Sequence, residues 1–262
     1  MGGIVVGDTK KIKADFLFDG QVLNLTLNAP KGNVLDIKMI SELTEAVEKL
    51  GSNPQVKAFV FQGAGEHFSY GASIPEHTKE LAPKLLSAFH NFFRTLIEVS
   101  KPTFALVQGQ CIGGGLELAA FCNWIFASEN ARFGQPEIKL SVFPPVASLI
   151  LPHRIGQSAA DDLVLTGRSI TAQEAKQLAL VHTVSHEPLK QLEEFISTHI
   201  LPKSTIALQF SVKSCRFEMH QAFLKNVDQI EKLYVEELME SEDANEGISA
   251  FMEKRQPVWK NR

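Results

Sequence analysis

Hydrophobic and polar residues alternate near the start of the chain. In residues 23–28, leucines take turns with Asn and Thr, which is the two-residue period of a strand with one buried face. The dipeptide Asp19-Gly20, a few residues before this run, is typical of a tight turn. The pattern therefore predicts that the chain opens with a β-hairpin.

Helical and strand patterns then alternate along the chain. Residues 39–50 have helical periodicity, and the apolar runs at 56–62, 102–108 and 123–128 predict buried strands. A second helix is expected where apolar side chains recur at helical spacing, at Leu85, Leu86, Phe89, Phe92, Phe93, Leu96 and Ile97. Strands that alternate with helices predict an α/β fold.

The last part of the chain has a purely helical pattern. From about Pro202 onward the sequence is rich in Lys and Glu, with one apolar stripe formed by Phe223, Val227, Ile230 and Tyr234. No Pro/Ser-rich linker precedes this region. We therefore expect one compact unit, with a mixed core over residues 1–198 and a helical region over residues 199–262.

Composition excludes several classes of protein. The chain has 262 residues, 44% hydrophobic and 21% charged, with a formal charge of −4. It is long enough to bury a large core, and it has no basic surplus for a nucleic-acid backbone. The longest apolar stretch, residues 142–152, contains three prolines and is too short to span a bilayer. We expect neither nucleic acid nor a membrane as a partner.

The cysteines and the N-terminus indicate a compartment. Cys111, Cys122 and Cys215 are far apart in the sequence and odd in number, which favours reduced thiols and a cytoplasmic protein. No secretory signal pattern opens the chain, and Val6 stands where a myristoylation motif needs Ser or Thr.

The segment 109–119, Gly-Gln-Cys-Ile-Gly-Gly-Gly-Leu-Glu-Leu-Ala, is the first candidate for chemistry. It follows a predicted strand and opens a helix, and three successive glycines allow a ligand to approach the backbone amides. A helix N-terminus favours negative charge on a nearby oxygen. Glu117 lies three residues after Gly114, so both share one helix face. The alternative is that the glycines only permit tight packing and that Glu117 is solvated.

Other glycine and metal motifs are absent from the sequence. Cys111 interrupts a GxGxxG pattern, Gly115 stands where a phosphate-binding loop needs Lys, and no GxSxG occurs. The histidines form no HExxH motif or close pair. We therefore expect no metal site.

Two loops complete the set of candidate segments. In residues 131–137, Pro136 precedes Glu137 in apolar surroundings, where the pKa of a carboxyl group rises. In residues 66–74, Gly71 permits a strained turn that presents the Ala72 amide. Taken alone, an exposed Glu and an ordinary loop remain the alternatives. Two histidines beside the second loop, at 67 and 77, are expected at the surface.

Four motifs together resemble the enoyl-CoA hydratase (crotonase) superfamily. They are FSYGA at 68–72, GGGLELA at 113–119, FGQPE at 133–137 and EGISAFMEKR at 246–255. The resemblance covers almost the whole chain. It implies a ClpP/crotonase-like spiral of ββα units with a C-terminal helical trimerisation region. It also implies a homo-oligomer, either a trimer or a dimer of trimers, that acts on acyl-CoA thioesters and needs no cofactor.

The resemblance also implies roles for individual residues. Ala72 and Gly114 match the two amides of an oxyanion hole, while Glu117 and Glu137 match the paired glutamates of true hydratases, a class of hydro-lyases. The positions that match substrate- and CoA-binding residues are Lys31, Ser73, Ile74, Gly113, Phe143 and Lys254. Because many members with other reactions lack one glutamate, the pair favours hydration.

The sequence departs from the common family pattern at two places. Residues 71–75 read Gly-Ala-Ser-Ile-Pro instead of Gly-Ala-Asp, an aliphatic residue and Lys, and residues 143–149 read Phe-Pro-Pro-Val-Ala-Ser-Leu instead of a glycine-rich run. Larger, stiffer residues are expected to reshape the wall of the acyl pocket.

Both departures resemble the cyclohexa-1,5-diene-1-carbonyl-CoA hydratases of anaerobic benzoyl-CoA degradation, which form 6-hydroxycyclohex-1-ene-1-carbonyl-CoA. Hydration of straight-chain enoyl-CoA in fatty acid β-oxidation is the alternative. A non-catalytic or RNA-binding protein with the same fold is the alternative from another class, and a decarboxylase or thioesterase also stays open.

Overall fold

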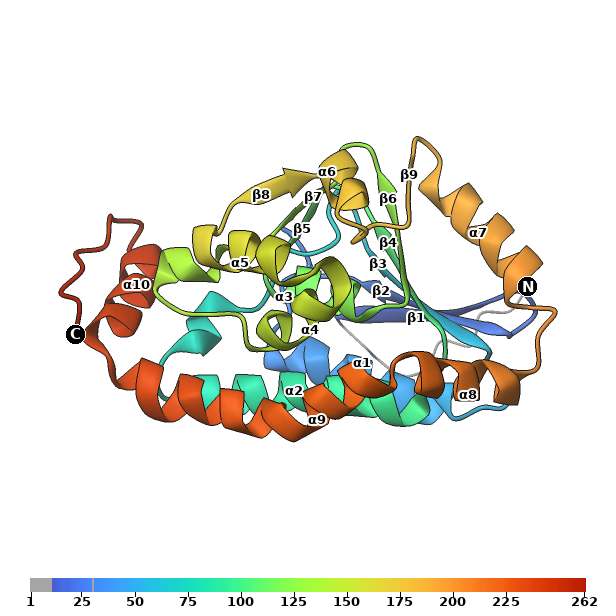
Figure 1. Ribbon diagram of the computed structural model, residues 1–262, viewed down its shortest axis with the longest axis horizontal. Coiled ribbons are helices and arrows are strands. Elements are labelled where there is room, and N and C mark those ends of the chain that lie inside the picture. The colour runs from blue at the N-terminus through green and yellow to red at the C-terminus, as the bar shows by residue number, and fades with distance from the viewer. Residues whose placement is uncertain (1–10, 30) are drawn as a thin grey trace.

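The computed structural model describes residues 11–29 and 31–262. The expectation about Val6 and the N-terminal signal falls on residues 1–10, which lie outside this range. Within the described residues, no helix is long and apolar enough to cross a membrane. The chain has a mixed α/β architecture (Figure 1).

A six-stranded sheet forms the centre of the molecule. In spatial order its strands are β1 (Ile12–Leu17), β2 (Val22–Leu27), β3 (Ala58–Gly63), β4 (Thr103–Val107), β6 (Trp124–Ser128) and β9 (Thr183–Ser185). β1 and β2 are antiparallel, and every following neighbour is parallel. The turn between β1 and β2 contains Asp19 and Gly20, both with positive φ. The predicted hairpin and three buried strands are confirmed.

A second, three-stranded sheet carries the loops of the candidate site. Its order is β5 (Gln110–Ile112), β7 (Arg132–Gly134) and β8 (Ser169–Thr171). β5 and β7 are parallel, whereas β7 and β8 are antiparallel. These strands are too short to give a periodic signal, so the sequence pattern does not predict them.

The helices surround the two sheets. They are α1 (Ile37–Gly51), α2 (Ala82–Val99), α3 (Gly114–Phe121), α4 (Pro145–Ile155), α5 (Gln157–Thr166), α6 (Ala172–Gln177), α7 (Pro188–His199), α8 (Thr205–Cys215), α9 (Phe217–Lys232) and α10 (Glu242–Met252). Four single-turn elements join them: the 3₁₀ helices η1 (Ile74–His77), η2 (Pro136–Leu140) and η4 (Leu238–Glu240), and the π-helix η3 (Leu233–Glu237).

The two helices predicted from periodicity, α1 and α2, pack against each other below the large sheet (Figure 1). The Asp36 side chain caps α1 by accepting a hydrogen bond from the Met39 amide at 2.9 Å. On α2, Phe92 and Phe93 are fully buried, and the Phe92 ring meets Phe61 of β3 edge-on. An apolar helix face against an apolar sheet face thus builds the main core.

Asn24 corrects the simple interpretation of the hairpin. Alternation predicted a solvent-facing side chain, but Asn24 is only 5% exposed. The second face of the sheet is also covered, because Val22, Val60 and Leu192 of α7 form a separate buried cluster there. Gln62 donates a hydrogen bond to the Asn24 side chain at 2.9 Å, so the buried amide is satisfied.

The C-terminal region lies along one side of the molecule. α9 packs against both α2 and α4, and α10 packs against η1 and η2 (Figure 1). The proposed division between residues 198 and 199 falls at the last turn of α7. Because α9 and α10 contact elements that hold the candidate site, this region forms one side of that site.

Candidate active site

Short backbone pairings bring the three candidate segments together. β5, which ends in the glycine run, pairs with β7, which ends at Gly134. Gly113 donates a backbone hydrogen bond to Gly134 at 2.9 Å. On the other side of β5, Ser69 pairs with Cys111 in a parallel bridge. The loops that follow Ser69, Ile112 and Gly134 therefore leave the small sheet side by side.

The amides of Ala72 and Gly114 lie close together. Gly71 has φ +93°, a conformation open mainly to glycine, and it turns the chain directly before Ala72. A β-carbon placed on Gly114 would lie 3.2 Å from the Ala72 nitrogen. Within the described residues, no hydrogen-bond acceptor is found for either N–H. Two free donors on neighbouring turns suit a single carbonyl oxygen.

Glu117 points into the protein interior rather than into solvent. It lies in α3 and is 4% exposed. Its Oε1 atom accepts a hydrogen bond from the Ala147 amide at 2.8 Å, in the first turn of α4. Helix α3 positions the carboxylate relative to Gly114, and the start of α4 fixes its orientation.

Glu137 lies next to the glycine run. The sequence suggested an irregular loop after Pro136, whereas the structure has the 3₁₀ helix η2, which begins at Pro136. A β-carbon on Gly113 would lie 2.8 Å from Glu137 Oε1, so the absence of a side chain at position 113 makes room for the carboxylate. With its nitrogen facing Glu137, the buried Gln135 amide donates to both carboxylate oxygens at 3.0 and 3.1 Å.

Both carboxyl groups hold their protons more tightly than an exposed glutamate does. Burial raises the pKa of Glu117 to about 7, while the amides of Ala147 and Val146 oppose this shift. Burial raises the pKa of Glu137 well above its usual range, and the charge of Glu117 adds to the effect. The two carboxyl groups therefore lose their protons in two steps that belong to the pair, and one proton stays at the site after the first step.

Replacing Glu117 by Gln is expected to stabilise the fold at pH 8 and much less at pH 4.5. The pKa of Glu117 is about 7 in the folded protein and 4.5 in its ordinary state, so the unfolded chain releases this proton first as pH rises. The wild-type fold thus loses stability from about pH 4.5 through pH 7, by about 3 kcal/mol. Denaturant unfolding of both proteins at the two pH values measures this difference. A Glu117→Gln effect that is the same at both would contradict the pKa.

An apolar wall beside the carboxylates includes Tyr234, which the sequence pattern did not single out as a site residue. Ile74 and Phe143, both predicted to bind substrate, pack with Tyr234 of η3 in one buried cluster. The Phe143 and Tyr234 rings meet edge-on, with centroids 5.3 Å apart. Tyr234 was recognised only as one position of an apolar stripe, because nothing in the local pattern distinguishes a tyrosine at a site from one in the core.

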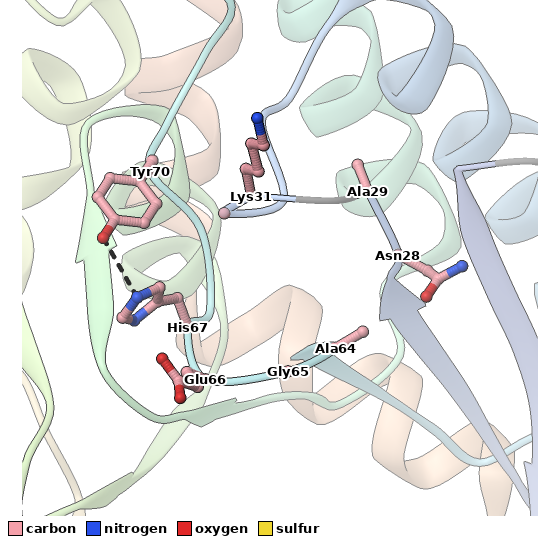
Figure 2. A pocket seen from close by; sticks show the side chains of 9 residues that line it. Asn28, Ala29, Lys31, Ala64, Gly65, Glu66, His67 and Tyr70 are labelled. Atoms are coloured by element: carbon pink, nitrogen blue, oxygen red, sulfur yellow. Dashed lines mark hydrogen bonds between the residues drawn. The ribbon is translucent and has the colours of Figure 1, made fainter.

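A surface cavity of about 750 Å³ lies beside the loop that leads to Ala72 (Figure 2). Lys31, Glu66, His67 and Tyr70 line it. His67 is half-buried rather than at the surface as expected: its Nδ1 accepts the Gln110 N–H at 3.2 Å, so Nε2 carries the proton toward the Tyr70 hydroxyl, 3.2 Å away (Figure 2). This pair holds Tyr70 in the cavity wall.

The other predicted binding residues are distributed around the site. Ser73 donates its backbone N–H to Leu35 and precedes η1, and Gly113 adjoins Glu137. Lys254 lies just beyond α10 and does not line the cavity that holds Lys31. In the part of the chain that the structure describes, no group of three His, Cys, Asp or Glu side chains is placed to hold a metal ion.

Solved structures share this fold. The arrangement matches the crystal structure of an enoyl-CoA hydratase from Mycobacterium avium with a TM-score of 0.85, at 24% sequence identity, covering 95% of this chain and 99% of that one. The crotonase fold expected from the sequence is confirmed.

The chain belongs to the enoyl-CoA hydratase/isomerase family, whose pattern matches residues 18–262. It is 39% identical to the cyclohexa-1,5-dienecarbonyl-CoA hydratase of Thauera aromatica, over 93% of this chain and 95% of that protein. It is 35% identical to the 2,3-dehydroadipyl-CoA hydratase of Escherichia coli K12, over 92% and 96%. The predicted family and its class of hydratase-type enzymes are confirmed.

Proposed function

We propose that this protein adds water to a conjugated double bond of a CoA thioester, and that its substrate is cyclohexa-1,5-diene-1-carbonyl-CoA. The observation that carries the proposal is the geometry around Gly113 and Gly114. The Glu137 carboxyl lies against Gly113, and the Ala72 amide lies against Gly114. An acid and a base thus lie beside two donors for a thioester oxygen.

The proposed mechanism follows from where charge develops. The amides of Ala72 and Gly114 donate to the thioester oxygen, which contributes about 3 to 4 kcal/mol per donor in comparable sites. Ionised Glu117 accepts a proton from water as the water oxygen bonds to the carbon β to the carbonyl. Glu137, whose pKa is raised by burial and by the charge of Glu117, gives its proton to the carbon skeleton. The two glutamates together hold one proton before the reaction and one proton after it.

No metal or redox group takes part in this scheme. In total one water is added: its hydroxyl group bonds to carbon, Glu137 gives a proton to the carbon skeleton, and Glu117 takes the other proton of the water. We therefore propose a reaction without a cofactor, in which CoA is part of the substrate.

The ring-shaped substrate is supported by the wall of the acyl pocket. Phe143 and Tyr234 present flat side chains, and Pro144 and Pro145 stiffen the start of α4. The Thauera relative, which has a cyclic substrate in its name, is 39% identical. Straight-chain hydration remains the second candidate, because other relatives at 34 to 35% identity are named enoyl-CoA hydratases.

Incubation with two thioesters tests the substrate. The purified protein is expected to convert the cyclic dienoyl-CoA to a product heavier by one water, identified by mass and chromatography as 6-hydroxycyclohex-1-ene-1-carbonyl-CoA. A water adduct from crotonyl-CoA alone would contradict the cyclic substrate. Salt-dependent RNA binding without hydration of either thioester would instead support the non-catalytic alternative.

The nucleotide end of CoA is proposed to occupy the cavity lined by Lys31 (Figure 2). Lys31 supplies a cation for phosphate at the open side of the loop that leads to Ala72. Lys254 is proposed to meet phosphate from the C-terminal side. Its position outside this cavity fits a contribution to a neighbouring subunit of the proposed oligomer.

Exposed apolar side chains support that oligomer. Phe210, Phe217 and Phe251, on α8, α9 and α10, are 66%, 61% and 53% exposed, and large apolar side chains in water favour contact with a partner. Light scattering is expected to give three or six times the chain mass of 29.0 kDa. All three cysteines are free thiols, which supports the proposed cytoplasmic location.

A further inference from the structure

Tyr234 is a buried tyrosine whose hydroxyl has no protein partner. It lies in the π-helix η3, directly after α9, and is 1% exposed. Within the described residues, its hydroxyl oxygen is enclosed and makes no hydrogen bond. A π-turn widens a helix by one residue, and such turns are frequent at functional sites.

An unpartnered hydroxyl in the interior is unfavourable for the fold. Burying it without a hydrogen bond destabilises the folded state, and phenylalanine would fill nearly the same volume without that cost. Buried polar groups are paired as a rule, so an unpaired hydroxyl close to a candidate site is a candidate partner for a group bound there.

The neighbours of Tyr234 show where that partner would lie. Its ring packs against Phe143 in a cluster that includes Ile74 and Leu140. Ile74 follows the Ala72 donor by two residues, and Leu140 ends the short helix η2 that begins beside Glu137. The ring thus closes the apolar wall on the side of the two carboxyl groups.

Electrostatics agrees with this placement. Burial, followed by the charges of Glu137 and Glu117, raises the pKa of Tyr234 above its usual range, so the phenol keeps its proton and acts only as a donor in the neutral range. The charges of both carboxylates act on the phenol, but its hydroxyl hydrogen-bonds neither of them. A group bound between them is therefore its natural acceptor.

We propose that the Tyr234 hydroxyl donates a hydrogen bond to the oxygen of the water that Glu117 and Glu137 hold, and then to the hydroxyl group of the product. This inference rests on the proposed hydration. Water has two lone pairs: one attacks the carbon, and the other accepts from Tyr234, while a hydrogen goes to Glu117. In the reverse reaction the same donor stabilises the departing hydroxyl.

Replacing Tyr234 by Phe tests the role of the hydroxyl while keeping the ring against Phe143. We expect kcat for hydration to fall by about 10- to 100-fold, because one hydrogen bond to a reacting oxygen is lost. KM for the thioester should change less than about twofold, since the bond forms to water and not to CoA. The melting temperature should stay equal or rise, because a buried unpaired hydroxyl is removed.

A matched control comes from the same region of the chain. His220 of α9 also has a buried ring nitrogen without a partner, and it stacks on Phe121. His220→Phe should leave kcat unchanged within about twofold, because His220 is outside the proposed site. In a Glu137→Gln background, Tyr234→Phe should cause a smaller further loss than it does alone, since both groups act on one water.

The outcomes separate this inference from the proposed function. If the wild-type enzyme hydrates its thioester and Tyr234→Phe keeps the same kcat, the role of Tyr234 is overturned and hydration stands. A fall in kcat together with a lower melting temperature indicates a structural role and also overturns it. If the wild type hydrates no thioester, the proposed function itself fails.

Discussion

Replacing Glu137 by Gln is expected to slow hydration by about a thousandfold or more, while the thioester still binds. The substitution keeps the size of the side chain but removes the carboxyl proton, and general acid-base groups contribute about 10²- to 10⁴-fold each. Glu117→Gln should cause a loss of similar size because it removes the base. Quenched assays of product formation give the rates, and calorimetric titration with a saturated acyl-CoA gives the dissociation constant.

Exposed Glu98 at the end of α2 provides the control for these variants, since Glu98→Gln changes the charge equally and should keep the wild-type rate. Loss of thioester binding in Glu137→Gln would point to a folding defect instead of a missing proton. Rates near wild type in either site variant would rule out the two-carboxylate mechanism.

The part of the site that sequence reasoning predicted most directly is local. Gly114 and Glu117 lie in the same two turns of α3, so helical geometry alone relates them. Ala72 and Glu137 are different, because their positions depend on the pairing of Ser69 with Cys111 and of β5 with β7. Strands of three residues leave no periodic pattern, so only the family resemblance joined these residues to the first two.

In the fold, too, local patterns were predictable and features that depend on distant segments were not. Residues 85–97 were predicted as a helix because their apolar face is long and regular, and α2 spans Ala82–Val99. The burial of Asn24 was not predictable, since it requires α7 and the neighbouring strands to cover the second face of the sheet. Tyr234 escaped notice for a related reason: a core position and a site position have identical spacing on an amphipathic helix.

Gly113→Ala is expected to reduce turnover by about a hundredfold or more, through displacement of Glu137. Gly113 has φ 55° and ψ −131°, a region that side chains rarely adopt. The new β-carbon would lie 2.8 Å from Glu137 Oε1. Because a carboxyl group at the end of a side chain moves more easily than backbone, Glu137 should yield, and a shift of about 1 Å in a reacting group costs about 10²-fold in rate.

Gly156 separates this displacement from backbone strain. It also has a positive φ, 77°, but a β-carbon there would meet no atom within 4 Å. Gly156→Ala should lose about 1 to 3 kcal/mol of stability from strain and keep the wild-type kcat. Gly113→Ala should lose a similar amount of stability, measured by denaturant unfolding, but also its turnover. If both variants kept wild-type turnover, the contact between Gly113 and Glu137 would not matter for the reaction, and the glycine would serve only the turn before α3.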